Sequence, residues 1–287
     1  MEFNVSNKIG SLYVVATPIG NLEDITHRAE RILKEVDLIL AEDTRHSKKL
    51  LNHIRAITLV KSFHDFNEGK ITPQVIEILK QGQDVALISD AGTPLISDPG
   101  FQLVKAAQDE GLVVVPIPGA SAAISALSVA GLATHKFVFE GFLPVRSATR
   151  KKHLLNLVKE RRTMVFFEAP HRIKALLTDC VDVFGKNRPA VLCRELTKKF
   201  ETIHGNTVQH LLDYLSEDLN QQKGEFVVVV QGIEGKNQLD QEESVRVLRI
   251  LLQHSLSLKE ASVIAAEITG DKKNKLYKLA LEISKRE

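Results

Sequence analysis

The sequence has no tryptophan and very little cysteine. Cys180 and Cys193 are its two cysteines in 287 residues. Two cysteines are too few for a disulfide framework, and their spacing does not match a metal-binding motif. The composition therefore excludes a disulfide-stapled scaffold, predicts no metal site, and favours a reducing, cytoplasmic location.

Long apolar runs are missing as well. The longest strand-like run, FVVVV at 226–230, is far shorter than the roughly 20 apolar residues of a membrane-spanning helix. The segment MEFNVSNKIG at 1–10 is too polar to be the apolar core of a signal peptide. We expect a soluble protein without membrane contact.

The chain has almost no excess of charge of either sign. Its 38 Lys and Arg face 36 Asp and Glu, which gives a net charge of +2. This balance does not indicate a nucleic-acid partner, so any basic surface must be local. With 44% apolar residues the chain is an ordinary globular protein, and its length suggests about two domains.

Several motifs of common enzyme classes are absent from the sequence. It contains no G-x-G-x-x-G after a strand and no G-x-x-x-x-G-K-[ST], which argues against a dinucleotide-binding domain and a P-loop NTPase. H-E-x-x-H and G-x-S-x-G are missing too, which argues against a zinc protease and an α/β-hydrolase.

Short apolar runs alternate with amphipathic segments along most of the chain. Such runs, bounded by turn residues, are typical of strands buried on both faces, as in parallel sheets. The predicted strands are 12–16, 37–41, 84–89, 113–117, 137–142, 163–169, 190–196 and 225–230. Helical patterns between them predict the α/β class, with two α/β domains.

Changes in composition predict the domain boundaries. The segment PIPGAS at 116–121 separates domains at 1–117 and 118–235, and a polar segment leads into a helical extension at 236–287. Within this extension, the helices predicted at 257–268 and 272–285 resemble a helix-turn-helix, which often contacts nucleic acid. The alternative is a capping bundle whose lysines form a solvated face.

Four loops follow predicted strands of the first domain, where open α/β sheets bind their ligands. They are 16–26, 41–46, 89–100 and 116–123. In the third loop Gly92 permits close approach of a ligand, and we interpret Asp98 and Pro99 as the N-cap and first residue of a helix. The loop therefore predicts a small-molecule site.

The loop AEDTRH at 41–46 places four ionisable side chains in five positions: Glu42, Asp43, Arg45 and His46. Burying such groups is unfavourable unless they pair, so mutual ion pairing is one explanation and a ligand-facing cleft is the other. We favour the cleft. In the second domain, FFEAPHR and RELTKKF add a polar wall, so the residues alone predict a cleft for a small polar ligand.

Taken together, VATPIGNLEDIT, LAEDTRHSKKLL, HDFNE, LISDAGTPLISDPG, FEGFLP, FFEAPHR and CRELTKKFETIHG resemble one family. It is the family of bacterial small-subunit ribosomal RNA 2′-O-methyltransferases, among the tetrapyrrole-methylase-like (class III) enzymes. The similarity covers about residues 10–235, and the helical tail also fits. AEDTRH together with SDAGTP is far more specific than either string alone.

The resemblance implies two α/β domains with S-adenosylmethionine in the cleft between them, no metal, and a homodimer. It implies transfer of a methyl group to the ribose 2′-oxygen of a decoding-site cytidine in 16S ribosomal RNA of the small ribosomal subunit. Carried over by matching strings, the cofactor-binding residues are Pro18, Gly20, Ser89, Asp90, Ala91, Gly92, Ser121, Ala122, Phe167 and Leu196.

A ribose hydroxyl is a weak nucleophile, so a nearby base would help the transfer. Asp43 and Glu168 are the candidate bases, and the choice between them is open. The side chains that would orient phosphate or sugar are Arg45, His171, Arg172 and Lys198.

RNA contact requires a local basic surface, and the segment 146–162 has seven Lys and Arg against one Glu. Phosphate contact by this segment and a solvated helix face are equally compatible with the pattern. The candidate RNA-binding residues are Arg146, Arg150, Lys151, Lys152, Arg172 and Lys198.

Two other functions stay open. One is methylation of a small molecule or a protein side chain by the same fold. The other is a helix-turn-helix regulator whose α/β domains sense a nucleotide-like effector without turnover. The AEDTRH string and the helical tail argue against the first, and the polar loops of the second domain argue against the second.

Overall fold

The computed structural model of the chain describes residues 9–233, 238–254 and 256–284. They fall into two units. One contains residues up to 155 together with 162–231, and the other contains 156–161 with the described residues from 232 onward. The first unit has two sheets, and we call the parts built on them the first lobe (9–117) and the second lobe (118–231).

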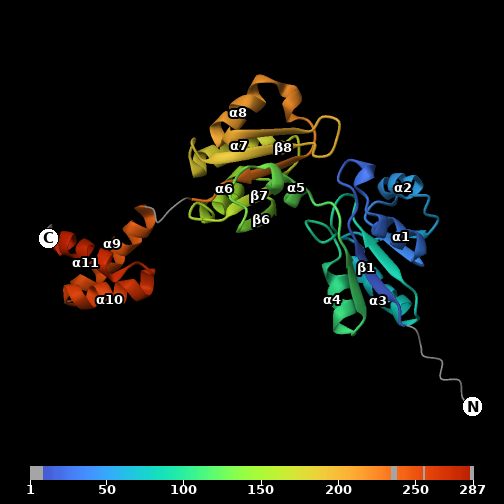
Figure 1. The fold of residues 1–287 in the computed structure, drawn as a ribbon, viewed down its shortest axis with the longest axis horizontal. Helices are drawn as coiled ribbons and strands as arrows, with labels where there is room; N and C mark the ends of the chain where they lie inside the picture. Colours follow the sequence, from blue (N-terminus) through green and yellow to red (C-terminus); the bar gives the residue numbers. More distant parts are fainter. Residues whose placement is uncertain (1–8, 234–237, 255, 285–287) are drawn as a thin grey trace, which may run out of the picture. The chain divides into compact units, whose positions relative to one another are not determined.

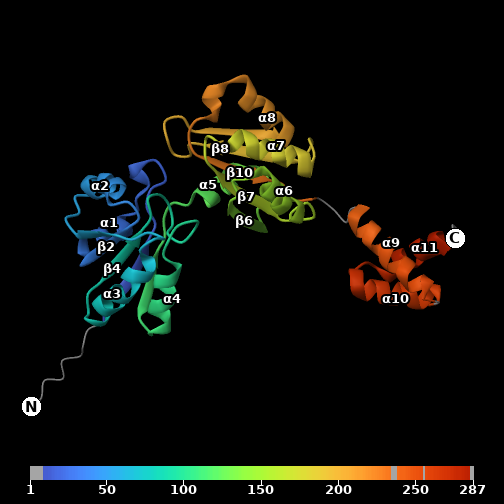
Figure 2. The same cartoon turned by 180° about the vertical axis from the view of Figure 1, so that it is seen from behind.

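The first lobe is a parallel sheet with helices on both faces (Figures 1 and 2). Its strands lie in the order β3-β2-β4-β1-β5. They are β1 (Ser11–Val15), β2 (Leu38–Ala41), β3 (Leu59–Ser62), β4 (Val85–Ile88) and β5 (Val113–Ile117). The connecting helices are α1 (His27–Glu35), α2 (Thr44–His53), α3 (Glu68–Lys80) and α4 (Phe101–Asp109), with a 3-10 turn η1 (Leu22–Asp24).

Alternation along the strands produces two separate cores. Leu38 and Leu40 of β2 pack with α3 and α4, whereas Ile39 and Ala41 pack with α1 and α2. Four of the five strands were predicted from their apolar runs. The fifth, β3, was missed because it is a half-buried edge strand of sequence LVKS with no apolar run.

The second lobe is a mixed sheet in the order β6-β7-β10-β8-β9. Its strands are β6 (Phe137–Phe142), β7 (Thr163–Glu168), β8 (Pro189–Arg194), β9 (Thr202–Thr207) and β10 (Phe226–Val230). Its helices are α5 (Ala122–Val129), α6 (Ser147–Asn156), α7 (Ile173–Phe184) and α8 (Val208–Glu217), with a 3-10 turn η2 (Leu219–Gln222).

Among the described neighbouring strands of this sheet, only β6 and β7 pair in parallel; β10 is antiparallel to both β7 and β8, and β9 is antiparallel to β8. The predicted strands at 137–142, 163–169, 190–196 and 225–230 are confirmed. The edge strand β9 was missed, since its sequence TIHGNT is polar and largely exposed. The α/β class holds for both lobes.

The second unit contains α9 (Gln238–Gln253), α10 (Leu258–Thr269) and α11 (Lys273–Ser284). Leu248, Ala261 and Leu276, one from each helix, are fully buried in its core. Ser257 and Glu260 form a capping box at the start of α10, and Gly270 ends that helix in the left-handed conformation. The helices predicted at 257–268 and 272–285 are confirmed over the described residues as α10 and α11.

The predicted domain boundary after residue 117 stays a prediction, and the one after residue 235 lies outside the described residues. Among the described residues, no helix is long and apolar enough to cross a membrane.

Two phenylalanines three positions apart allow a matched test of the core that contains Leu38 and Leu40. Phe63 is fully buried, whereas Phe66 is 99% exposed. We expect Phe63→Ala to lower the free energy of unfolding by about 3–5 kcal/mol, since it removes a large ring and leaves a cavity. Phe66→Ala should change it by less than about 0.5 kcal/mol. Urea unfolding measures both, and equal losses would contradict this core assignment.

Candidate functional site

A cavity of about 480 Å³ lies between the loops that follow β1, β2 and β4 and the edge of the second lobe. This volume is typical of sites for small ligands. Its lining residues include five acidic residues and, among the described residues, no Lys, Arg or His. The acidic residues are Glu42, Asp90, Asp98, Glu168 and Glu225.

Backbone hydrogen bonds join the loops after β1 and β4. Thr17 N–H donates to the carbonyl of Gly92 at 2.8 Å, and Gly92 N–H donates to the carbonyl of Thr17 at 3.0 Å. Gly92 has φ of +84°, a conformation that side-chain-bearing residues rarely adopt. A glycine at this position therefore lets the loop after β4 turn back across the end of β1.

The loop after β1 also reaches the second lobe. Asn21 N–H donates to Thr197 Oγ1 at 3.1 Å. A Cβ atom on Gly20 would lie 2.4 Å from Cγ of Lys198, so only glycine allows this approach. The two lobes therefore meet next to the cavity through Gly20 and Asn21.

Seven of the ten predicted cofactor-binding residues line the cavity: Asp90, Ala91, Gly92, Ser121, Ala122, Phe167 and Leu196. The other three, Pro18, Gly20 and Ser89, do not line the cavity but are next in sequence to residues that do. Ile19, between Pro18 and Gly20, lines the cavity in place of its two neighbours. The Ser89 hydroxyl donates to the carbonyls of Ala91 and Gly92 at 3.3 and 3.4 Å, which holds the loop in its curve.

Asp98 lines the cavity, although its sequence context predicted a helix N-cap. The prediction that Asp98 caps a helix beginning at Pro99 is wrong, because α4 begins at Phe101 with Gly100 as its N-cap. Positive φ angles at Leu95 (73°) and Ser97 (70°) turn the segment toward the cavity instead. An Asp-Pro pair is typical of turns as well as helix starts, so the signal fitted either structure.

The acidic side chains of the first lobe raise one another's proton affinity. Burial raises the pKa of Asp98 to about 6, and the charges of Glu42 and Asp90 add to this while a hydrogen bond from Ser89 opposes it. The pKa of Glu42 is also raised, chiefly by burial and then by Asp90. The cavity therefore has a negative potential that favours a cationic ligand.

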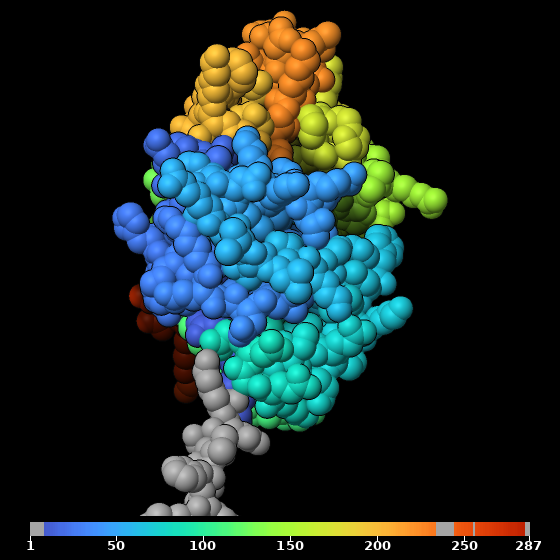
Figure 3. Space-filling view, turned by 90° about the vertical axis from the view of Figure 1, so that its right-hand side faces the viewer, coloured from blue at the N-terminus to red at the C-terminus, as the bar shows by residue number. Residues whose placement is uncertain are grey.

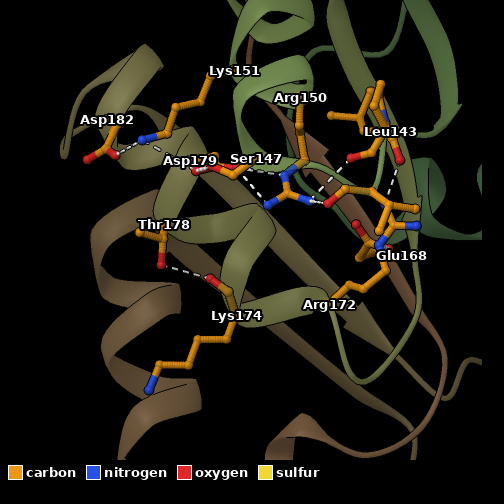
Figure 4. A network of polar contacts seen from close by, with 12 residues as sticks. Leu143, Ser147, Arg150, Lys151, Glu168, Arg172, Lys174, Thr178, Asp179 and Asp182 are labelled. Atoms are coloured by element: carbon orange, nitrogen blue, oxygen red, sulfur yellow. Dashed lines mark hydrogen bonds and ion pairs between the residues drawn. The ribbon is translucent and has the colours of Figure 1, made fainter.

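Glu168 ends β7 and belongs to the cavity lining from the second lobe, with its side chain beside Arg172 (Figure 4). Its residue is 2% exposed, and burial raises the pKa of its carboxyl, although the Ala169 N–H and the charge of Arg172 oppose this. Oε1 accepts the Ala169 N–H at 2.9 Å and lies 3.0 Å from Nε of Arg172. The Glu168 side chain has no exposed surface, and Oε2 has no hydrogen-bond partner among the described residues.

The AEDTRH loop contains both a cavity residue and an ion pair, which were the two explanations considered for its ionisable side chains. Glu42 lines the cavity, whereas Asp43 and Arg45 form an ion pair at 3.1 Å outside it. Asp43 Oδ1 caps α2 by accepting the Arg45 N–H at 2.8 Å, and the Arg45 side chain lowers the pKa of Asp43. His171 is exposed and does not line the cavity.

Arg150 does not fit its predicted role as an RNA contact. It is 2% exposed, and its guanidinium lies 2.7 Å from Oδ2 of Asp179 (Figure 4). Its Nη1 also donates to the carbonyls of Pro144 and Val145 at 3.3 and 3.0 Å. The buried charge is neutralised within the fold, so Arg150 fixes α6 to α7 and to the loop after β6.

The other predicted RNA contacts differ in whether their charged groups form ion pairs within the fold. Lys151 pairs with Asp182 at 2.6 Å, and Lys198 pairs with Glu195 and Glu225 at 2.9 Å each. Arg172 pairs with Glu168 and donates to the carbonyl of Leu143. Arg146 and Lys152 are exposed.

Asp98 makes stability depend on pH in a defined direction. Its pKa rises from 3.8 to about 6 on folding, so the folded protein binds more protons than the unfolded chain between these values. Its contribution to the free energy of unfolding therefore falls as pH rises from about 4 to 7. We expect Asp98→Asn to be more stable than the parent protein at pH 7.5, with the difference shrinking toward pH 5. Urea midpoints across this range measure it, and a constant difference would contradict the assignment.

Two family models match this chain. One, described as Tetrapyrrole (Corrin/Porphyrin) Methylases, matches residues 11–212, and the other, described as RsmI C-terminal HTH domain, matches residues 238–284. The second match agrees with the helix-turn-helix alternative for the helical extension.

Curated relatives match over nearly the whole chain. A protein of Pseudomonas aeruginosa strain PAO1 named Ribosomal RNA small subunit methyltransferase I is 52% identical over 95% of this chain and 97% of its own length. A protein of Escherichia coli O157:H7 with the same name is 49% identical over 97% of each chain.

Solved structures share the fold at low identity. A uroporphyrin-III-C-methyltransferase from Thermus thermophilus superposes with a TM-score of 0.56 at 21% identity, over 77% of this chain and 94% of that one. A diphthine synthase superposes with a TM-score of 0.59 at 16% identity, over 78% and 90%. The chain belongs to the tetrapyrrole (corrin/porphyrin) methylase family, together with relatives named ribosomal RNA small subunit methyltransferase I.

Proposed function

We propose that this protein uses S-adenosylmethionine to methylate the ribose 2′-oxygen of a decoding-site cytidine in 16S ribosomal RNA. The observation that carries the proposal is the cavity with five acidic residues and no basic residue among its described lining residues. Such a cavity attracts a cationic methyl donor. The names of the curated relatives support small-subunit ribosomal RNA as the methyl acceptor.

The lining residues fit this cofactor chemically. Asp90, Asp98 and Glu42 offer carboxylates to its positively charged groups, and the apolar side chains of Ile19 and Phe167 offer a surface for a flat ring. S-adenosylmethionine, when bound, supplies a methyl group on a cationic sulfur that is open to in-line displacement. Positioning of the reacting atoms then supplies much of the rate, with no metal required.

Glu168 is the base in this proposal. Its Oε2 has no hydrogen-bond partner among the described residues, and its raised pKa makes it a better proton acceptor than an ordinary carboxylate. As the ribose oxygen bonds to the methyl carbon and the carbon–sulfur bond breaks, Oε2 accepts the hydroxyl proton. Arg172 holds the carboxyl in place through Oε1. Asp43 is the weaker candidate, because Arg45 lowers its pKa.

The proposal extends to assembly and location. A homodimer would cover apolar side chains next to the cavity, since Ile96 and Phe101 are 42% and 68% exposed. Ribosomal RNA as substrate implies a cytoplasmic protein that contacts the small ribosomal subunit. Lys273 and Lys278 of α11 are exposed on the helical extension and would add RNA contacts.

A direct assay tests the function. Purified protein, methyl-labelled S-adenosylmethionine and small ribosomal subunits from a strain lacking the enzyme are incubated, and the RNA is digested to nucleosides. We expect labelled 2′-O-methylcytidine. Cofactor binding without labelled RNA would favour a small-molecule or protein substrate, and absence of cofactor binding would favour a non-enzymatic sensor.

Substitutions separate the two candidate bases. We expect Glu168→Gln to lower kcat about 100-fold or more, which is the usual effect of removing a general base, with little change in cofactor affinity. Asp43→Asn should lower kcat less, because Asp43 lies outside the cavity. Single-turnover methylation and calorimetric titration with the cofactor measure these effects. If both variants keep the parent rate, neither residue is the base.

A further inference from the structure

The outward face of α2 carries a stripe of positive charge. Arg45, Lys48 and Lys49 are exposed at spacings of three and four residues, whereas Ser47, Leu50 and Leu51 on the opposite face are buried. We call these three cations the α2 stripe. It belongs to the surface formed by residues 20–80, which Figure 3 shows in blue to cyan.

The positive charges of the α2 stripe destabilise helix α2. Like charges three or four residues apart repel each other, and cations in the first turns of a helix interact unfavourably with the helix dipole. The helix Thr44–His53 contains no acidic residue. A helix face that served only solubility would mix charges of both signs.

Helices α1 and α4 of this lobe pair several of their cations with acidic residues of the same helix. On α1, Arg31 lies 2.6 Å from Glu35 and Lys34 lies 2.6 Å from Glu30. On α4, Lys105 lies 2.8 Å from Asp109. In the α2 stripe, Arg45 pairs with the capping residue Asp43, and Lys48 and Lys49 form no ion pair with any described residue.

The α2 stripe begins at the rim of the cavity. Glu42, three residues before Arg45, lines the cavity, and the Asp43 N–H donates to Oδ1 of the cavity residue Asp90 at 3.0 Å. The acidic cavity repels phosphate, so an RNA strand must place its phosphates outside it. Among the described residues, the nearest cations along the chain from this rim that form no ion pair are Lys48 and Lys49 of the α2 stripe.

Phe66 stands on the same edge of the sheet. Strand β3 pairs with β2 through Ala41 and Ser62, so the loop after β3 lies beside the start of α2. Asn67 closes this loop by accepting the His64 N–H at 2.9 Å and donating to the carbonyl of Ser62 at 3.2 Å. The closed loop presents the Phe66 ring at 99% exposure, where it buries no surface of the fold.

We propose that the α2 stripe and Phe66 form the surface on which the RNA strand lies beside the cavity. The α2 stripe binds backbone phosphates, and the Phe66 ring stacks on a base next to the target nucleotide. The inference rests on the proposed function and names its RNA contacts. It places them on the first lobe, whereas the RNA contacts predicted from the sequence lie in 146–152 and at Arg172 and Lys198.

The double variant Lys48→Glu/Lys49→Glu tests the phosphate contacts. Its matched control, Lys80→Glu/Lys105→Glu, reverses two charges on α3 and α4, which cover the other face of the same sheet. We expect the stripe variant to raise KM for small ribosomal subunits about tenfold or more and to reduce the salt slope of RNA binding by about two. The control should change KM less than about twofold, and both should keep the parent cofactor Kd by calorimetry.

Phe66→Ala and Phe66→Trp test the stacking contact. We expect Phe66→Ala to weaken binding of a labelled 16S fragment about five- to 100-fold, as loss of base stacking does, and Phe66→Trp to retain it. Fluorescence anisotropy measures this without turnover. If the parent protein methylates RNA while the α2 stripe and Phe66 variants keep its KM, RNA affinity and salt slope, this inference is overturned alone. If the parent protein methylates no RNA, the proposed function is overturned with it.

Discussion

The paired backbone hydrogen bonds between Thr17 and Gly92 are the contact on which the rest of the site depends. They join the loops that follow two adjacent strands, β1 and β4, at the carboxyl edge of the first sheet. From this junction, one loop leads to Gly20 and Asn21 at the second lobe, and the other carries Asp90 and Asp98 into the cavity. The lobe contact and the acidic wall therefore have a common origin.

Charge is separated over a short stretch of chain at this edge. Glu42 faces the cavity with a raised pKa, whereas Arg45, three residues later, is exposed with a side-chain fraction of 91%. An acidic cavity suits a cationic donor, and a basic rim suits a polyanionic acceptor. The protein has a net charge of only +2, so this local separation, and not the overall balance, accounts for the two opposite ligands in our proposal.

Arg150 of the second lobe shows that a run of basic residues does not by itself indicate an exposed basic surface. Arg150 and Lys152 are two residues apart in one basic segment, yet Arg150 is buried against Asp179 and Lys152 is exposed. Nothing in the local sequence distinguishes them, because Asp179 lies 29 residues away on α7. Asp98 is a second example, because its local Asp-Pro pair is compatible with both a helix start and a loop that lines the cavity.

By itself, the sequence determined the α/β class, most strands and helices, and the four loops that carry the site. Apolar periodicity, turn residues and motif strings are local properties of the chain, so they can be recognised without knowledge of the fold. The tertiary structure decided which acidic residues share one cavity, that Glu168 Oε2 has no hydrogen-bond partner among the described residues, and that Arg150 is neutralised. Burial and pairing depend on residues far apart in the chain, and only folding brings those together.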